Sequence, residues 1–273
     1  MPRQPNDLTP QDAALALAWL AEMGAGEVIG EAPVNRLAQM AAAAAAPSSG
    51  RKPGAIEEQK PAPVTLSPAP VSPGGLALAD CQTLDDLVAA LGAFDVCPLK
   101  KTATNLCFAD GNPAARVMLV GEAPGRDEDI QGKPFVGRSG QLLDRMLAAI
   151  GLSRTAPDRE NAVFITNTIF WRPPGNRTPT EAETTMCLPF LLRAIEIQKP
   201  DFIVCLGATP AQRLTGLSEG ILRMRGRWTD AEIGGRRIPL LPTLHPAYLL
   251  RQPAHKRLSW RDLLSLRQAL DAH

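Results

Sequence analysis

The chain has 273 residues, 45% of them hydrophobic and 21% charged, an ordinary globular balance for one domain of about 200 residues with extensions. Its formal net charge of +1 excludes a bulk attraction to nucleic acid, although ten Lys or Arg against four Asp or Glu fall between residues 220 and 273. This local excess suits either a phosphate backbone or a solvated helix face.

The cysteines and the lengths of the apolar runs indicate the compartment. None of the five cysteines forms a C-x-x-C pair, and the start of the chain carries Asp7 and Asp12 against Arg3, unlike a basic leader. No apolar run approaches the roughly 20 residues that span a membrane. We therefore expect a cytoplasmic protein with reduced thiols and no membrane segment.

The first 75 residues differ in composition from the rest. Thr9-Pro10-Gln11-Asp12 is typical of a helix start, and the apolar sequence after it predicts a helical segment within residues 1–40. Dense Pro, Ala, Ser and Gly predict a flexible linker over 41–75. The helix would bind a protein partner or serve only as a leader, and a folded domain is expected over 76–273.

Short apolar runs alternate with helical patterns in this folded domain. Helices are expected to begin near Thr83, Ser139, Thr180 and Lys256. Buried strands are expected at 116–121, 162–167, 201–207 and 238–246. The alternation predicts an α/β fold, a three-layer α/β/α sandwich with a mainly parallel central sheet of about four strands.

Polar residues follow three of the predicted strands, namely Glu122, Asn167 and His245. Because the carboxyl ends of parallel strands meet at one edge of a sheet, we expect these residues to converge on a ligand site. The Asn167 amide offers a donor and an acceptor, which suits a pyrimidine edge, but an asparagine here also caps turns. A histidine such as His245, taken alone, is more often structural than catalytic.

The segment GEAPGRDEDIQGKPFVG (121–137) suggests a phosphate loop at first sight. Six residues separate Gly125 from Gly132, which does not match the spacing of a Walker loop, and the three acids at 127–129 would repel a phosphate. We therefore interpret the segment as one wall of a pocket for a flat, neutral ring. Phe135 in this wall is either a core residue or a stacking face.

Four motifs together resemble the uracil-DNA glycosylase superfamily, and most of all its bacterial family 4. They are GEAPGRDEDIQGKPFVGRSGQLLDRML, ITNTIFWRPPGNRTPT, LRMRGRW and PTLHPAYLLRQP. The likeness runs in order from about residue 97 to residue 264 and leaves the residues before 76 outside it. It implies a DNA-repair hydrolase that flips uracil out of DNA, cuts the N-glycosidic bond and leaves an abasic site.

The resemblance also implies a role for each residue of the pocket. Phe135 would stack on the uracil, and the Asn167 amide would bind the edge of the base and reject cytosine. Backbone groups of Glu122 and Ala123 would pair with the ring. His245 would donate to the uracil oxygen as negative charge builds there.

A carboxylate would orient the attacking water and stabilise the cationic sugar. Glu122 is the first choice for this catalytic acid and Glu128 is the second. Some superfamily members instead capture uracil-DNA covalently through a histidine in a basic insert. No histidine lies between residues 121 and 187 here, so we expect turnover.

DNA contacts are assigned mainly to the segment 246–251. It would enter the minor groove as a wedge, with Leu249 or Leu250 as the plug that replaces the flipped base. Phosphate contacts are assigned to Arg223, Arg225 and Arg251. The expected partner is therefore uracil-containing DNA, bound by a monomer associated with the bacterial nucleoid.

Family 4 usually carries a [4Fe–4S] cluster on four cysteines. Cys97 and Cys187 match two of these positions, while Phe94 and Trp171 stand at the other two. Two thiolates do not replace four, so we expect no metal and no cofactor, with aromatic packing in place of the cluster. A non-catalytic DNA- or partner-binding protein of the same fold is the alternative, and a nucleotide-metabolising α/β enzyme is disfavoured by the loop spacing.

Overall fold

The computed structural model describes residues 65–66 and 78–272 of the chain. All described residues belong to one compact unit, Ala62–His273. The helical segment predicted in 1–40 and nearly all of the linker predicted in 41–75 therefore lie outside the described residues. Within that linker, Thr65–Leu66 forms a short strand, β1.

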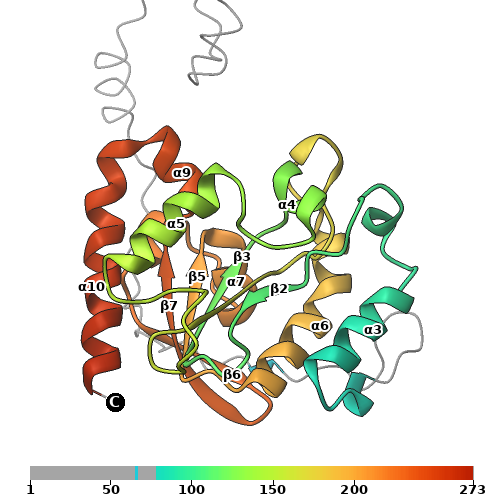
Figure 1. Ribbon diagram of the computed structural model, residues 1–273, viewed down its shortest axis with the longest axis horizontal. Helices are drawn as coiled ribbons and strands as arrows, with labels where there is room; N and C mark the ends of the chain where they lie inside the picture. The colour runs from blue at the N-terminus through green and yellow to red at the C-terminus, as the bar shows by residue number, and fades with distance from the viewer. Residues whose placement is uncertain (1–64, 67–77, 273) are drawn as a thin grey trace, which may run out of the picture. The chain divides into compact units, whose positions relative to one another are not determined.

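The described residues form a seven-stranded sheet in the order β1-β6-β7-β5-β3-β4-β2 (Figure 1). Its central strands are β3 (Val117–Gly121), β4 (Val163–Asn167), β5 (Phe202–Leu206) and β7 (Arg236–Thr243). These four pair in parallel, and β3, β4 and β5 are buried at every position, as expected for strands covered on both faces. The four predicted strands are confirmed at these positions.

The prediction of about four strands is wrong in number, because shorter strands extend both edges of the sheet. β2 (Ala109–Gly111) pairs antiparallel with β4, β6 (Thr229–Ile233) pairs antiparallel with β7, and β1 runs parallel to β6. β2 has only three residues, and β6 carries Thr, Asp and Glu. Neither contains the apolar run that reveals a central strand, so the sequence did not predict them. Their antiparallel pairing makes the sheet mixed and not wholly parallel.

Helices begin at or close to the predicted starts. The α-helices of the described residues are α3 (Leu84–Ala93), α4 (Arg126–Gln131), α5 (Arg138–Ala148), α6 (Glu181–Gln198), α7 (Ala208–Thr215), α8 (Ile221–Met224), α9 (Pro246–Arg251) and α10 (Lys256–Ala272). Thr83 and Thr180 cap α3 and α6 by accepting from the N–H groups of Asp86 and Glu183. Within 65–66 and 78–272, none of the helices has the length and apolarity to cross a membrane.

The helices cover both faces of the sheet (Figure 1). On one face, α5 and α10 contribute buried leucines to a cluster that includes Val117 and Ile165. On the other face, α3, α6 and α7 pack against Met118 and Ile203. Alternate strand residues therefore point into opposite layers, which gives the predicted α/β/α arrangement and leaves the carboxyl edge of the sheet for a site.

Candidate functional site

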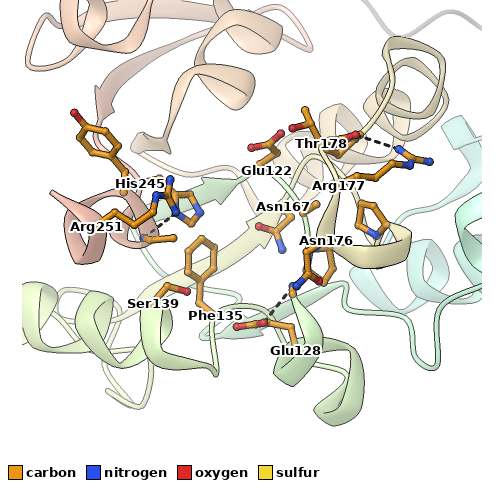
Figure 2. Close-up of a pocket in the computed structure, with 17 residues that line it drawn as sticks. Glu122, Glu128, Phe135, Ser139, Asn167, Asn176, Arg177, Thr178, His245 and Arg251 are labelled. Carbon is orange, nitrogen blue, oxygen red and sulfur yellow. Dashed lines mark hydrogen bonds between the residues drawn. The ribbon is translucent and has the colours of Figure 1, made fainter. Parts of the chain in front are cut away.

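A cavity of about 500 Å³ lies at the carboxyl edge of the central strands (Figure 2). It is lined by Glu122, which follows β3, by Asn167, which ends β4, and by His245, just beyond β7. The parallel register sets Gly121 opposite Asn167. Figure 2 shows Phe135 beside them, on the segment that leads into α5. The convergence expected from the strand ends is present in the structure.

Phe135 adopts a strained backbone conformation beside this cavity. Its backbone φ of 54° lies in the left-handed region, which residues other than glycine rarely adopt. The ring is 4% exposed, and its centroid lies 5.4 Å from that of the His245 ring with 32° between the planes. A Cβ on Gly121 would lie 2.6 Å from the Phe135 ring, so only glycine fits there. The ring belongs to the core on one side and borders the cavity on the other.

Asn167 lines the cavity with a buried side-chain amide whose oxygen, Oδ1, has no hydrogen-bond partner among the described residues. The residue is 1% exposed. A buried carbonyl oxygen left unpaired costs about 1–3 kcal/mol, so such groups are retained where a ligand satisfies them. The alternative of an asparagine that caps the next turn does not account for this free oxygen. Asn167 is therefore a candidate ligand-binding amide.

Glu122 is half-buried at the end of β3, with its side chain at the cavity. Burial raises the pKa of its carboxyl above the usual value, and a hydrogen bond with Thr209 partly opposes that shift. The backbone carbonyl of Glu122 already accepts from Ile169 N at 3.0 Å and from Thr168 Oγ1 at 2.7 Å. Ala123 lines the cavity next to it. The side chain of Glu122 is thus the group available for chemistry.

Glu128 also lines the cavity, but its carboxylate is engaged with backbone amides. Its Oε2 accepts from Gly125 N at 3.1 Å, and its Oε1 accepts from Val136 N at 3.0 Å and Gly137 N at 2.9 Å. It lies in the first turn of α4, a helix in the segment that we interpret from sequence as loop. The acids at 127–129 belong there because carboxylates stabilise a helix N-terminus.

His245 presents a neutral imidazole at the N-terminus of α9. Its Nδ1 accepts from Ala247 N at 3.1 Å, which leaves the proton on Nε2. Burial, together with a smaller effect of the Arg251 charge, lowers the pKa of His245 to about 4. The side chain is therefore a neutral hydrogen-bond donor near pH 7, with Arg251 beside it (Figure 2).

The structure separates the residues predicted to contact DNA. Leu249 is 0% exposed, packed in a cluster with Leu142 and Leu244, so it does not stand ready as a plug and Leu250 remains the candidate. Arg225 forms an ion pair with Asp262 rather than facing solvent. Partners distant in sequence hold both side chains, so Leu249 and Arg225 are left out of the proposed DNA contacts.

A second wall of the cavity comes from the segment between β4 and α6, which the sequence motif contains but to which we assigned no role. Asn176, Arg177 and Thr178 line the cavity there, and the Arg177 guanidinium points away from the strand ends (Figure 2). Asn176 has a left-handed φ of 56°, and Arg177 pairs through two nitrogens with Glu183. The Asn-Arg pair after Gly175 is the local signal of this turn.

The residues at the four positions of the family's cluster do not fit four-thiolate ligation. Phe94 and Trp171 stack with 6.5 Å between ring centroids, and Phe94 also packs against Phe190 at 4.9 Å. Cys97 and Cys187 are buried beside them, and a hydrogen bond from the Cys187 thiol lowers the pKa of Cys97 to about 7. No group of three or more His, Cys, Asp or Glu suited to a metal ion occurs in 65–66 and 78–272.

A buried amide beside an aromatic ring is an arrangement that suits a flat, hydrogen-bonding ring. The family model of the uracil DNA glycosylase superfamily matches residues 108–264, and the chain belongs to this superfamily. The type-4 uracil-DNA glycosylase of Archaeoglobus fulgidus is 42% identical over 176 residues, 63% of this chain and 85% of that protein. The type-4 uracil-DNA glycosylase of Thermotoga maritima is 43% identical over 161 residues, 59% of this chain and 79% of that protein.

The lowered pKa of His245 predicts a pH-dependent contribution to stability. Because the folded pKa of about 4 lies below the usual 6.5, the unfolded chain binds the proton more readily between these values. The free energy of unfolding therefore falls as the pH drops from 6.5 towards 4. Urea unfolding is measured at pH 7 and at pH 5. Between these pH values, the free energy of unfolding of His245→Gln should fall by about 2 kcal/mol less than that of the wild type. Parallel losses in the two proteins would contradict a lowered pKa at His245.

Proposed function

We propose that the chain removes uracil from DNA by hydrolysing the N-glycosidic bond, which leaves an abasic site for repair. Both relatives described above are type-4 uracil-DNA glycosylases, and the chain aligns with most of the length of each. The observation that carries the proposal is the unpaired Asn167 Oδ1 beside the Phe135 ring. A flat base that hydrogen-bonds to this amide would satisfy the unpaired oxygen.

Recognition of uracil follows from the donor and acceptor order on its edge. Uracil presents a ring N–H next to a carbonyl, so Asn167 Oδ1 accepts from the N–H while Nδ2 donates to the carbonyl. Cytosine presents an unprotonated ring nitrogen and an amino group, which would face like groups on Asn167. Stacking on the Phe135 ring adds about 1–3 kcal/mol without discriminating between bases.

His245 supports departure of the base. As the glycosidic bond breaks, the bonding electrons move onto the uracil ring and negative charge builds on its carbonyl oxygen. The Nε2–H of a neutral His245 donates to that oxygen and stabilises it. The lowered pKa suits this role, because the imidazole is already neutral at physiological pH and carries its one proton on Nε2.

Glu122 is the residue best placed to act on water. Its carboxylate lies at the cavity free of backbone amides, whereas both oxygens of Glu128 already accept from the loop. A raised pKa makes Glu122 a stronger proton acceptor, and its charge also stabilises the cationic sugar. We therefore assign the orientation of the attacking water to Glu122 and a structural role to Glu128.

DNA binding is assigned to α9 and the exposed arginines near it. Leu250 is partly exposed on α9 and takes the role of plug, while Arg251 borders the cavity where a phosphate of the flipped nucleotide would pass. Arg223 is exposed and forms no ion pair within the described part of the chain, so it is free for a backbone phosphate.

The function is tested with a uracil-containing oligonucleotide, single- and double-stranded, followed by alkaline cleavage of abasic sites. After treatment with the wild type and then alkali, the strand should be broken at uracil, and a control oligonucleotide with thymine at that position should stay intact. His245→Ala should lower the rate roughly 100-fold or more, because a donor to the developing charge is lost. Asn167→Asp should also be strongly impaired, and full activity of that variant would disprove the base-binding assignment. If the wild type produces no scission with either substrate, the proposed glycosylase activity is refuted.

The choice of Glu122 over Glu128 is tested by Glu122→Gln. Glutamine keeps the size of the side chain but neither accepts the proton from water nor carries a charge, so kcat should fall roughly 100-fold or more. Inhibition by free uracil should stay at the wild-type level. Glu160→Gln, an exposed acid paired with Arg116 at the other end of β3, is the control and should keep full kcat. Full activity of Glu122→Gln would show that another group orients the attacking water.

The aromatic packing at the degenerate cluster positions leads us to propose that this chain folds without an iron–sulfur cluster. Phe94 and Trp171 fill space that four-cysteine ligation needs. Protein purified anaerobically should be colourless and contain far less than one iron per chain. The double variant Phe94→Cys, Trp171→Cys, which restores four cysteines, provides the comparison. A brown wild type with about four irons per chain would overturn the proposal.

A further inference from the structure

Arg154 binds the backbone that carries Phe135. Its Nη1 donates to the Pro134 carbonyl at 3.0 Å, and its Nη2 donates to the Phe135 carbonyl at 2.8 Å. The same guanidinium pairs with Asp144 at 2.8 Å and with Asp110 at 3.1 Å. The side chain is 11% exposed and is absent from the lining of the cavity. It therefore reaches the site only through the backbone that it holds.

Glu128 holds the same segment from its other end. It accepts from the N–H groups of Val136 and Gly137, the two residues after Phe135. The carbonyls on one side of the aromatic residue thus face a cation, and the amides on its other side face an anion. Hydrogen bonds to charged partners are stronger than neutral ones, so the short segment is fixed at both ends.

Phe135 needs this support because its backbone is strained. A left-handed φ persists in a residue with a side chain only where the surrounding contacts determine it. The close approach of α5 contributes as well, since a Cβ on Gly140 would lie 1.8 Å from the Phe135 carbonyl oxygen. Loss of the guanidinium would free this carbonyl and let the backbone relax, which would move the ring relative to Asn167.

We propose that Arg154 is a positioning residue for base binding, which keeps the Phe135 ring at the cavity by fixing the carbonyls of Pro134 and Phe135. The inference rests on the proposed function, because the position of the ring matters only if a flat base enters. A planar guanidinium suits two adjacent carbonyls through two parallel N–H groups. A lysine ammonium is a point charge without that fork.

The test is a double-mutant cycle that joins Arg154 to Phe135. Inhibition by free uracil and the kcat and KM for a uracil oligonucleotide are measured for wild type, Arg154→Lys, Phe135→Ala and the double variant. Arg154→Lys should weaken inhibition by uracil and raise KM about tenfold, with kcat changed less than about threefold. In the Phe135→Ala background, Arg154→Lys should have no further effect on inhibition by uracil.

Two controls separate positioning from general stability. Arg159→Gln removes bonds to the Ala114 carbonyl and Asp201 at the opposite edge of the sheet, and it should leave inhibition by uracil unchanged. Should Arg154→Lys fail to fold, Asp144→Asn at a half-exposed site tests the same support, because it removes the carboxylate that orients the guanidinium. Its weaker effect, about threefold, should also vanish in the Phe135→Ala background.

Each outcome bears on one hypothesis. Wild-type inhibition by uracil in both Arg154→Lys and Asp144→Asn would refute the positioning role. Effects that multiply with that of Phe135→Ala would also refute it, because Arg154 would then act independently of the ring. In either case, wild-type cleavage of uracil-DNA would leave the proposed function standing. A wild type without cleavage would refute the function itself.

Discussion

The absence of a side chain at Gly121 is the constraint on which the site depends. A Cβ at this position would lie 2.3 Å from Asn167 Oδ1 and 2.6 Å from the Phe135 ring. The strand can therefore bring an amide and an aromatic ring to one place only because it ends in glycine. The register of β3 and β4 sets Asn167 opposite Gly121, so rigid backbone pairing rather than a loop fixes the amide.

Several unfavourable features gather at this edge of the sheet. Asn167 leaves an oxygen unpaired, Phe135 adopts a left-handed backbone, and His245 is held neutral by burial. The first two lower the stability of the fold at any pH, and the lowered pKa of His245 does so as the pH falls below 6.5. Departures from local rules that cluster at one place are expected at a functional site rather than at random over a surface.

The sequence predicts the parts of this molecule that depend on local signals. Apolar runs located the four central strands, and the polar residues just after them, Glu122, Asn167 and His245, indeed share one cavity. The helix starts expected near Thr83 and Thr180 are likewise confirmed, and both threonines cap their helices. These features were accessible because each is determined by residues adjacent in the chain.

Features that depend on distant partners were not predictable. Arg225 looks like a free cation until Asp262, 37 residues later, is placed against it. Leu249 and Leu250 are equivalent in sequence, and only the packing of α9 on Leu142 buries the first. The acids before Phe135 likewise gave no sign that Glu128 turns back onto the loop. In each case a side chain of ambiguous sequence acquires its role from three-dimensional contacts.

The buried carboxylate of Asp262 gives α10 a part in the site although no residue of that helix lines the cavity. Besides its ion pair with Arg225, Asp262 accepts from Thr243 Oγ1 at 2.7 Å, at the end of β7 and two residues before His245. The helix thereby anchors the strand end that presents the imidazole. A chain shortened to Met1–His255 would keep every residue that lines the cavity and still lose the carboxylate that holds the end of β7 next to His245. The structural unit that supports the cavity is therefore larger than the set of residues that line it.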